Sequence, residues 1–133
     1  MNTQDLNTSL VALIRKKQEL GQLSYNDDRY DDVEEELHDQ EDDFNDNFGE
    51  YLEEVLGDVH QKHCPDTDVL LPTAYLPEAL SPEGQVDITG KEGVWVEADA
   101  YPNKEARLLL VPNPARLILS VGKNVREEVW RAE

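Results

Sequence analysis

The sequence of 133 residues is poor in basic residues, with 12 lysines and arginines against 30 aspartates and glutamates. A nucleic-acid-binding surface needs a stripe of positive charge to neutralise phosphates, and no segment of this chain supplies one. We therefore expect no direct contact with DNA or RNA.

Other absences narrow the class of protein further. The single cysteine, Cys64, excludes an intrachain disulfide and is typical of a reducing compartment. The chain has no apolar stretch of about 18 residues that could span a membrane, and its first residues lack the features of a secretion signal. It also lacks a glycine-rich phosphate loop and a serine in a glycine-flanked elbow. These absences predict a cytoplasmic, non-enzymatic protein with no catalytic residues, no cofactor and no membrane partner.

The negative charge that is present is concentrated in residues 27–58. This segment contains one residue of the lysine and arginine types, Arg29, and carries −15 of the net charge of −18. Its sixteen carboxylates, which we call the acidic belt, are Asp27, Asp28, Asp31, Asp32, Glu34, Glu35, Glu36, Asp39, Glu41, Asp42, Asp43, Asp46, Glu50, Glu53, Glu54 and Asp58.

Apolar residues recur inside this acidic segment with a period of eleven. Val33, Phe44 and Val55 form one line and Leu37, Phe48 and Val59 another, as expected for a helix with about 3.67 residues per turn. The pattern predicts a long helix, from about residue 27 to 63, with one apolar seam and an anionic back. Cys64-Pro65 should end the helix, because proline disfavours helical geometry in the preceding residue. A bend is expected within residues 45–49, where Gly49 weakens the helix.

The remaining segments predict an α+β fold. Residues 1–64 should form a helical hairpin whose first helix spans about 3–20, and residues 65–90 a proline-rich connector with one short element near 69–76. Residues 91–133 should form a small antiparallel sheet of three or four strands, with one face packed on the helices. Its first element would be a strand over about residues 94–101. Residues 107–111 and 116–121 would form a hairpin through a turn at 112–115, and residues 125–131 fit either a strand or a short helix. We expect one compact unit.

The two predicted helices differ in length, so the first can cover only about half of the second. Either the C-terminal half of the chain or a second copy must cover the rest of the seam. The second possibility is the basis for predicting a homodimer. Its interface would consist of Val33, Leu37, Phe44, Phe48, Leu52, Val55 and Val59.

Among functions, the sequence favours a protein–protein interaction or scaffold protein whose acidic surface docks a basic partner. Two alternatives use the same charge. The protein could be a nucleic-acid-mimic inhibitor, because the belt has about one charge per 3 Å of helix, close to the 3.4 Å along a DNA strand. It could also be an acidic chaperone.

A metal-dependent enzyme is an alternative from another class. His60, His63 and Cys64 have the i, i+3, i+4 spacing of one helix face, and imidazole and thiolate are zinc ligands; Asp66 or Asp68 could complete the set. This spacing is not that of a zinc finger, and two histidines in the last turn of a helix are explained by the helix dipole. We predict no metal site there.

Two further patterns resemble metal sites and predict none. Glu35 and His38 form one E-x-x-H pair, whereas a di-iron bundle needs two such pairs and two more carboxylates. Residues 43–54 resemble a calcium loop, but Phe48 occupies the position that requires glycine.

Overall fold

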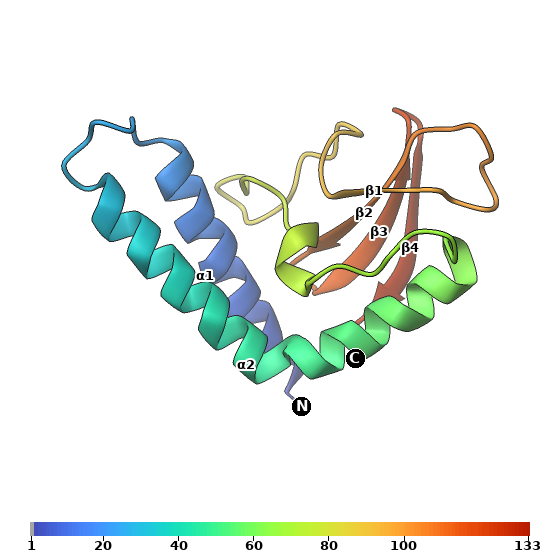
Figure 1. Ribbon diagram of the computed structural model, residues 1–133, viewed down its shortest axis with the longest axis horizontal. Coiled ribbons are helices and arrows are strands. Elements are labelled where there is room, and N and C mark those ends of the chain that lie inside the picture. The colour runs from blue at the N-terminus through green and yellow to red at the C-terminus, as the bar shows by residue number, and fades with distance from the viewer. Residues whose placement is uncertain (1) are drawn as a thin grey trace.

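The computed structural model describes residues 2–133 and shows the expected α+β arrangement (Figure 1). Two N-terminal helices, the second of them long, pack on a four-stranded antiparallel sheet at the C-terminus. In chain order the elements are α1 (Thr3–Gly21), α2 (Tyr30–His63), the 3-10 helix η1 (Pro72–Tyr75), β1 (Val94–Val96), β2 (Ala106–Val111), β3 (Arg116–Val121) and β4 (Val125–Arg131).

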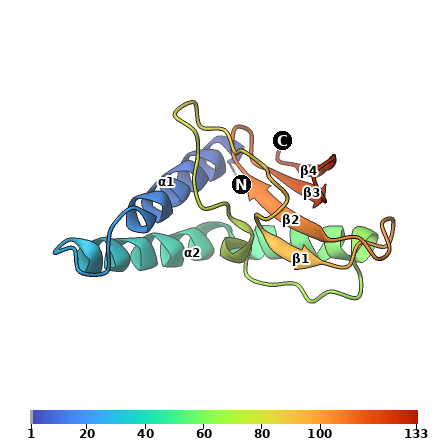
Figure 2. The same ribbon diagram turned by 90° about the horizontal axis from the view of Figure 1, so that it is seen from above.

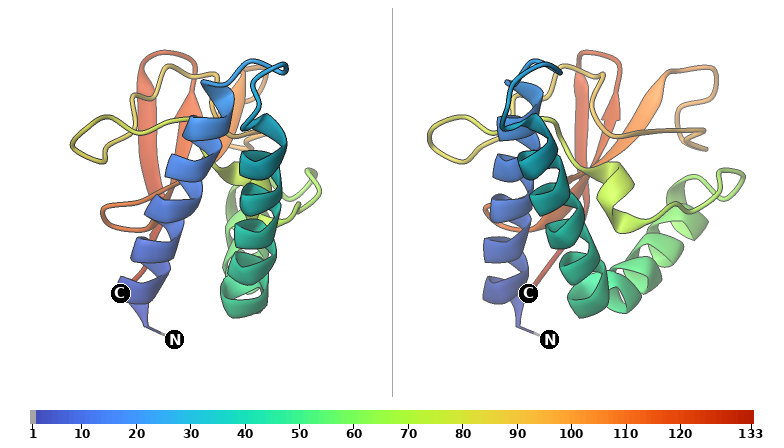
Figure 3. Two further views of the ribbon diagram at one scale, coloured as in Figure 1. Left: turned by 90° about the vertical axis from the view of Figure 1, so that its left-hand side faces the viewer. Right: turned by 60° about the vertical axis from the view of Figure 1, so that its left-hand side comes forward.

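The helix α1 and the first half of α2 form the predicted hairpin (Figure 3). Asn2 caps α1, because its side-chain oxygen accepts hydrogen bonds from the backbone N–H groups of Gln4 and Asp5. The helix α2 begins at Tyr30, three residues later than expected. The side chain of Asp27 accepts a hydrogen bond from the N–H of Arg29 at 2.8 Å, which holds residues 27–29 in a turn ahead of the helix.

The helix α2 changes direction near its middle, in the part of the sequence where we expected a bend (Figures 1 and 3). Its first half packs on α1 and its second half passes beneath the sheet. One helix therefore contributes to both halves of the molecule.

The sheet is a meander in the order β1-β2-β3-β4, with every neighbouring pair antiparallel. Residues 106–111 and 116–121 form the predicted hairpin. Residues 125–131, for which the sequence allowed either a strand or a short helix, form a strand. The first strand is shorter than expected and ends at Val96. Beyond it, the N–H of Glu97 donates to the hydroxyl of Thr67 and the N–H of Asp99 to the carbonyl of His63, which draw the chain away from β2.

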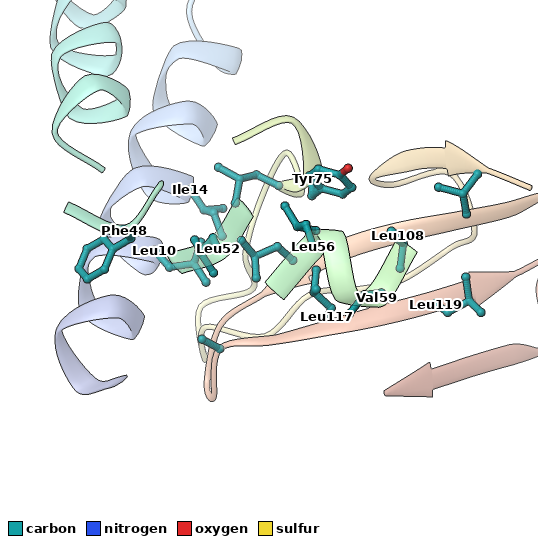
Figure 4. Packing of buried hydrophobic residues seen from close by; sticks show 14 of the residues in the cluster. Leu10, Ile14, Phe48, Leu52, Leu56, Val59, Tyr75, Leu108, Leu117 and Leu119 are labelled. Atoms are coloured by element: carbon teal, nitrogen blue, oxygen red, sulfur yellow. The ribbon is translucent and has the colours of Figure 1, made fainter. Parts of the chain in front are cut away.

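Both faces of the sheet contact other parts of the chain. The inner face, which includes Leu108, Leu117 and Leu119, joins the helices in one continuous hydrophobic core (Figure 4). On the outer face a second cluster of Leu109, Val111 and Ile118 lies against Val86 and Ile88 of the segment between η1 and β1 (Figure 2). Burial on both faces explains why β2 and β3 are nearly continuous apolar runs.

The seam of α2 is filled within a single chain. Figure 4 shows Phe48 and Leu52 beside Leu10 of α1, and Leu56 and Val59 near Leu117 of the sheet. Six of the seven residues proposed as a dimer interface are at most 8% exposed, and Val55 is half-buried against the same core. The C-terminal half of the chain is thus the cover that the seam requires. The homodimer stays a prediction, but an uncovered seam no longer supports it.

Candidate functional site

The acidic belt lies along the solvent side of α2 and the turn before it. Thirteen of its sixteen residues are exposed, and only Asp27, Glu34 and Glu41 are half-buried. The apolar residues of the seam occupy the opposite side of the same helix, so burial of the seam fixes the direction in which the carboxylates point.

Within residues 2–133, only two carboxylates of the belt form an ion pair. Asp27 pairs with Arg29 at 3.4 Å, and Glu36 pairs with Lys16 of α1 at 2.7 Å. Hydrogen bonds from Lys16 to Glu36 and Glu19 raise the pKa of the lysine. The other fourteen carboxylates have no cationic group of the described chain within 4.0 Å.

The belt also contains lines of like charge. Asp31, Glu35, Asp39 and Asp43 are spaced four residues apart along α2, and so are Asp42, Asp46, Glu50 and Glu54. Adjacent like charges at this spacing destabilise a helix by about 0.2–0.5 kcal/mol per pair at low salt. The arrangement therefore reduces the stability of the free protein.

His60, one of the three residues considered as metal ligands, has a structural role. Its Nδ1 lies 2.9 Å from the carbonyl oxygen of Thr67 and its Nε2 lies 2.9 Å from the hydroxyl of Tyr75. A carbonyl can only accept, so Nδ1–H donates to Thr67 and, in the neutral ring, Nε2 accepts from Tyr75. The Tyr75 hydroxyl in turn accepts from the N–H of Leu70. This network ties the segment after α2, and η1, to the end of the helix.

The other candidate ligands do not gather around His60. Among residues 2–133, no three side chains of the His, Cys, Asp and Glu types are placed to hold a metal ion. Both ring nitrogens of His60 already have partners, so metal binding would require breaking one of these hydrogen bonds. Glu35 and His38 are exposed, and residues 43–54 are continuous helix rather than a loop.

The thiol of Cys64 is fully buried at the end of α2. Burial, with a smaller contribution from the charge of Asp99, raises its pKa to about 11. The reactive form is the thiolate, which is scarce at neutral pH under these conditions. The structure thus gives Cys64 the properties of a packing residue.

We expect Cys64 to react slowly with Ellman's reagent at pH 8 in the native protein and rapidly after denaturation in urea, because only unfolding restores the exposure and the ordinary pKa of the thiol. The measurement is the rate of thionitrobenzoate release with and without urea. A native rate equal to that of a free thiol would contradict the buried position.

Comparisons with protein-family models, with curated proteins and with solved structures found no match. Within residues 2–133, neither α1 nor α2 is long and apolar enough to cross a lipid bilayer.

Proposed function

We propose that this protein is a non-enzymatic interaction protein whose acidic belt docks a basic segment of a partner protein. The observation that carries the proposal is the set of fourteen exposed or half-buried carboxylates that have no cationic partner in residues 2–133. A basic partner would neutralise charges that the chain itself leaves unpaired, and the field of the belt would accelerate its association.

The loss of stability that the belt causes supports this proposal. The fold needs only the seam side of α2, and neutral polar residues on the opposite side would leave the core intact while removing the repulsion along the helix. Surfaces that reduce stability without serving the core are characteristic of functional sites. The belt fits this description.

The bend in α2 bears on the nucleic-acid-mimic alternative. The mimicry hypothesis rested on the spacing of charges along a single helix, whereas the two halves of α2 run in different directions (Figure 1). A basic protein segment can follow either half, so we retain the basic-partner function as the proposal.

The test compares two variants of equal net charge. The belt variant carries Asp42→Asn, Asp46→Asn, Glu50→Gln and Glu54→Gln, and the control variant neutralises four exposed acids elsewhere, namely Glu83, Asp87, Glu127 and Glu133. The probe is a labelled peptide of alternating lysine and serine, and its affinity is measured by fluorescence polarisation at about 0.1 M salt, where charges farther apart than about 10 Å are screened.

We expect the belt variant to lose affinity by about tenfold or more and the control variant by less than about twofold, because the screened attraction is local to the belt. The belt variant should also melt at a higher temperature than the wild type at low salt. A higher melting temperature would show that its weaker binding is not caused by unfolding. Equal losses in the two variants would show that the peptide responds only to net charge and would contradict the proposal.

A further inference from the structure

Exposed apolar side chains are concentrated on one side of this molecule. Among residues 2–133, five large hydrophobic residues are substantially exposed. Four of them belong to β1 or to the segment between α2 and η1: Val69 (42%), Leu70 (46%), Leu71 (58%) and Trp95 (49%). The fifth, Tyr25, lies in the loop between the two helices. Single exposed apolar residues are common, but three consecutive ones in a loop are not expected unless they have a function.

The loop segment and the strand are held together by hydrogen bonds. The Thr67 hydroxyl accepts from the N–H of Glu97 at 2.9 Å, directly after β1, and the N–H of Leu70 donates to the buried hydroxyl of Tyr75. Figure 2 shows the segment between α2 and η1 on the β1 side of the sheet. The exposed residues of the loop therefore have a defined position relative to the edge strand.

A hollow of about 660 Å³ lies beside Trp95 and is also lined by Tyr101, Glu97, Asp99 and Glu105. Its volume lies within the range of about 300–1,000 Å³ that is typical of binding pockets. An aromatic ring next to carboxylates attracts a lysine or arginine side chain, through cation–π attraction to the ring and charge attraction to the acids.

The rim of this surface is acidic. We use the name β1 patch for the four apolar residues together with the exposed carboxylates that line the hollow or lie in the same loop. These carboxylates are Asp66, Asp68, Glu97, Asp99 and Glu105. Within residues 2–133, none of these carboxylates lies in an ion pair, and the one base among the residues that line the hollow is Lys104.

We propose that the β1 patch docks an extended basic segment of a partner protein, with an apolar side chain against Val69–Leu71 and a lysine or arginine in the hollow beside Trp95. The charge of the patch favours a basic segment over a second copy of the chain as the occupant. Two copies joined through this surface would bring their acidic rims together, in a protein whose net charge is already −18. A cationic segment instead gains attraction from every carboxylate of the rim.

This site is separate from the acidic belt and rests on its own observations. The belt offers charge without an apolar surface, whereas the β1 patch combines charge with apolar and aromatic side chains. A partner of the β1 patch should therefore be selected by its apolar residues as well as by its basic residues.

The experiment uses the full chain and two labelled peptides of equal charge, one of alternating leucine and arginine and one of alternating serine and arginine. The belt attracts both peptides through the same arginines, so the ratio of the two affinities isolates the β1 patch. We expect the wild type to bind the leucine–arginine peptide about tenfold more tightly or better. We expect Leu71→Ser and Trp95→Ala each to reduce this preference to less than about threefold.

Two substitutions complete the test. Tyr25→Ala removes an exposed aromatic residue far along the chain from the β1 patch and should leave the preference unchanged. Glu97→Gln keeps the shape of the side chain and leaves the backbone hydrogen bond to Thr67 in place, so a weaker affinity for the leucine–arginine peptide supports the charge contribution independently of folding. A wild type without preference, or an equal loss in Tyr25→Ala, would overturn the proposal. Light scattering that shows a wild-type dimer dissociated by Leu71→Ser would also overturn it, by assigning the β1 patch to a second copy.

Discussion

Replacing Leu52 with alanine should lower the free energy of unfolding by about 2–5 kcal/mol. Leu52 is 1% exposed and lies where α2 passes from the hairpin to the sheet, with Leu10 on one side and Leu56 on the other (Figure 4). Truncation of the side chain leaves a cavity where the helical hairpin meets the sheet, and a close-packed core cannot fill this cavity completely. Urea denaturation followed by circular dichroism measures the effect.

The adjacent residue provides the control for Leu52. Glu53 is exposed, and Glu53→Ala should change the stability by no more than about 0.5 kcal/mol. If Leu52→Ala retained the stability of the wild type and changed its oligomeric state instead, the seam would be an interface between chains and the account of the core would be wrong.

Replacing His60 with alanine should destabilise the protein by about 2–4 kcal/mol, because the Tyr75 hydroxyl and the Thr67 carbonyl each lose a partner and the ring leaves a cavity. The loss should be the same with EDTA or with added zinc, since the imidazole acts through these hydrogen bonds. Thermal melts of the wild type and the variant, with and without chelator, provide the measurement.

His63 is the matched control for His60. It lies three residues later on α2 and is only half-buried, so His63→Ala should cost much less than His60→Ala. The result that contradicts this account is one zinc per purified chain that disappears in His60→Ala or Cys64→Ser. That result would make the metal-dependent enzyme, so far an alternative, the leading function.

Much of the fold could be predicted from the sequence because burial leaves a periodic pattern. The eleven-residue period identified the face of α2 that is buried, and the turn at residues 112–115 identified the β2–β3 hairpin. The period indicates which face of the helix is buried, but it does not indicate which segment covers that face. The homodimer was predicted for this reason, whereas the sheet of the same chain covers Leu56 and Val59.

Contacts between segments that are distant in the sequence account for the other differences between the predicted and the observed fold. Alternation of apolar residues extended the predicted first strand to about residue 101. The strand ends early because the N–H groups of Glu97 and Asp99 donate hydrogen bonds to the Thr67 hydroxyl and the His63 carbonyl. The connector was expected to be mainly a loop, and Val86 and Ile88 within it cover the outer face of the sheet. These interactions join residues about twenty or more positions apart, beyond the reach of local patterns.

The acidic belt was evident from charge alone, while its lack of cationic partners depends on where the few bases lie in space. The β1 patch was not predicted. Val69, Leu70 and Leu71 are apolar, and apolar residues are expected to be buried by default, so only the three-dimensional arrangement shows that they are exposed.

The central claim, that the acidic belt is a docking surface for basic segments, is tested most directly by a nuclear magnetic resonance titration of the labelled full chain with the lysine–serine peptide. The account predicts that amide shifts change saturably along Asp31–Glu54 of α2, and that the changes along Asp42–Glu54 disappear in the belt variant and persist in the control variant. Shift changes spread evenly over all acidic residues, or equally strong changes in the two variants, would contradict it.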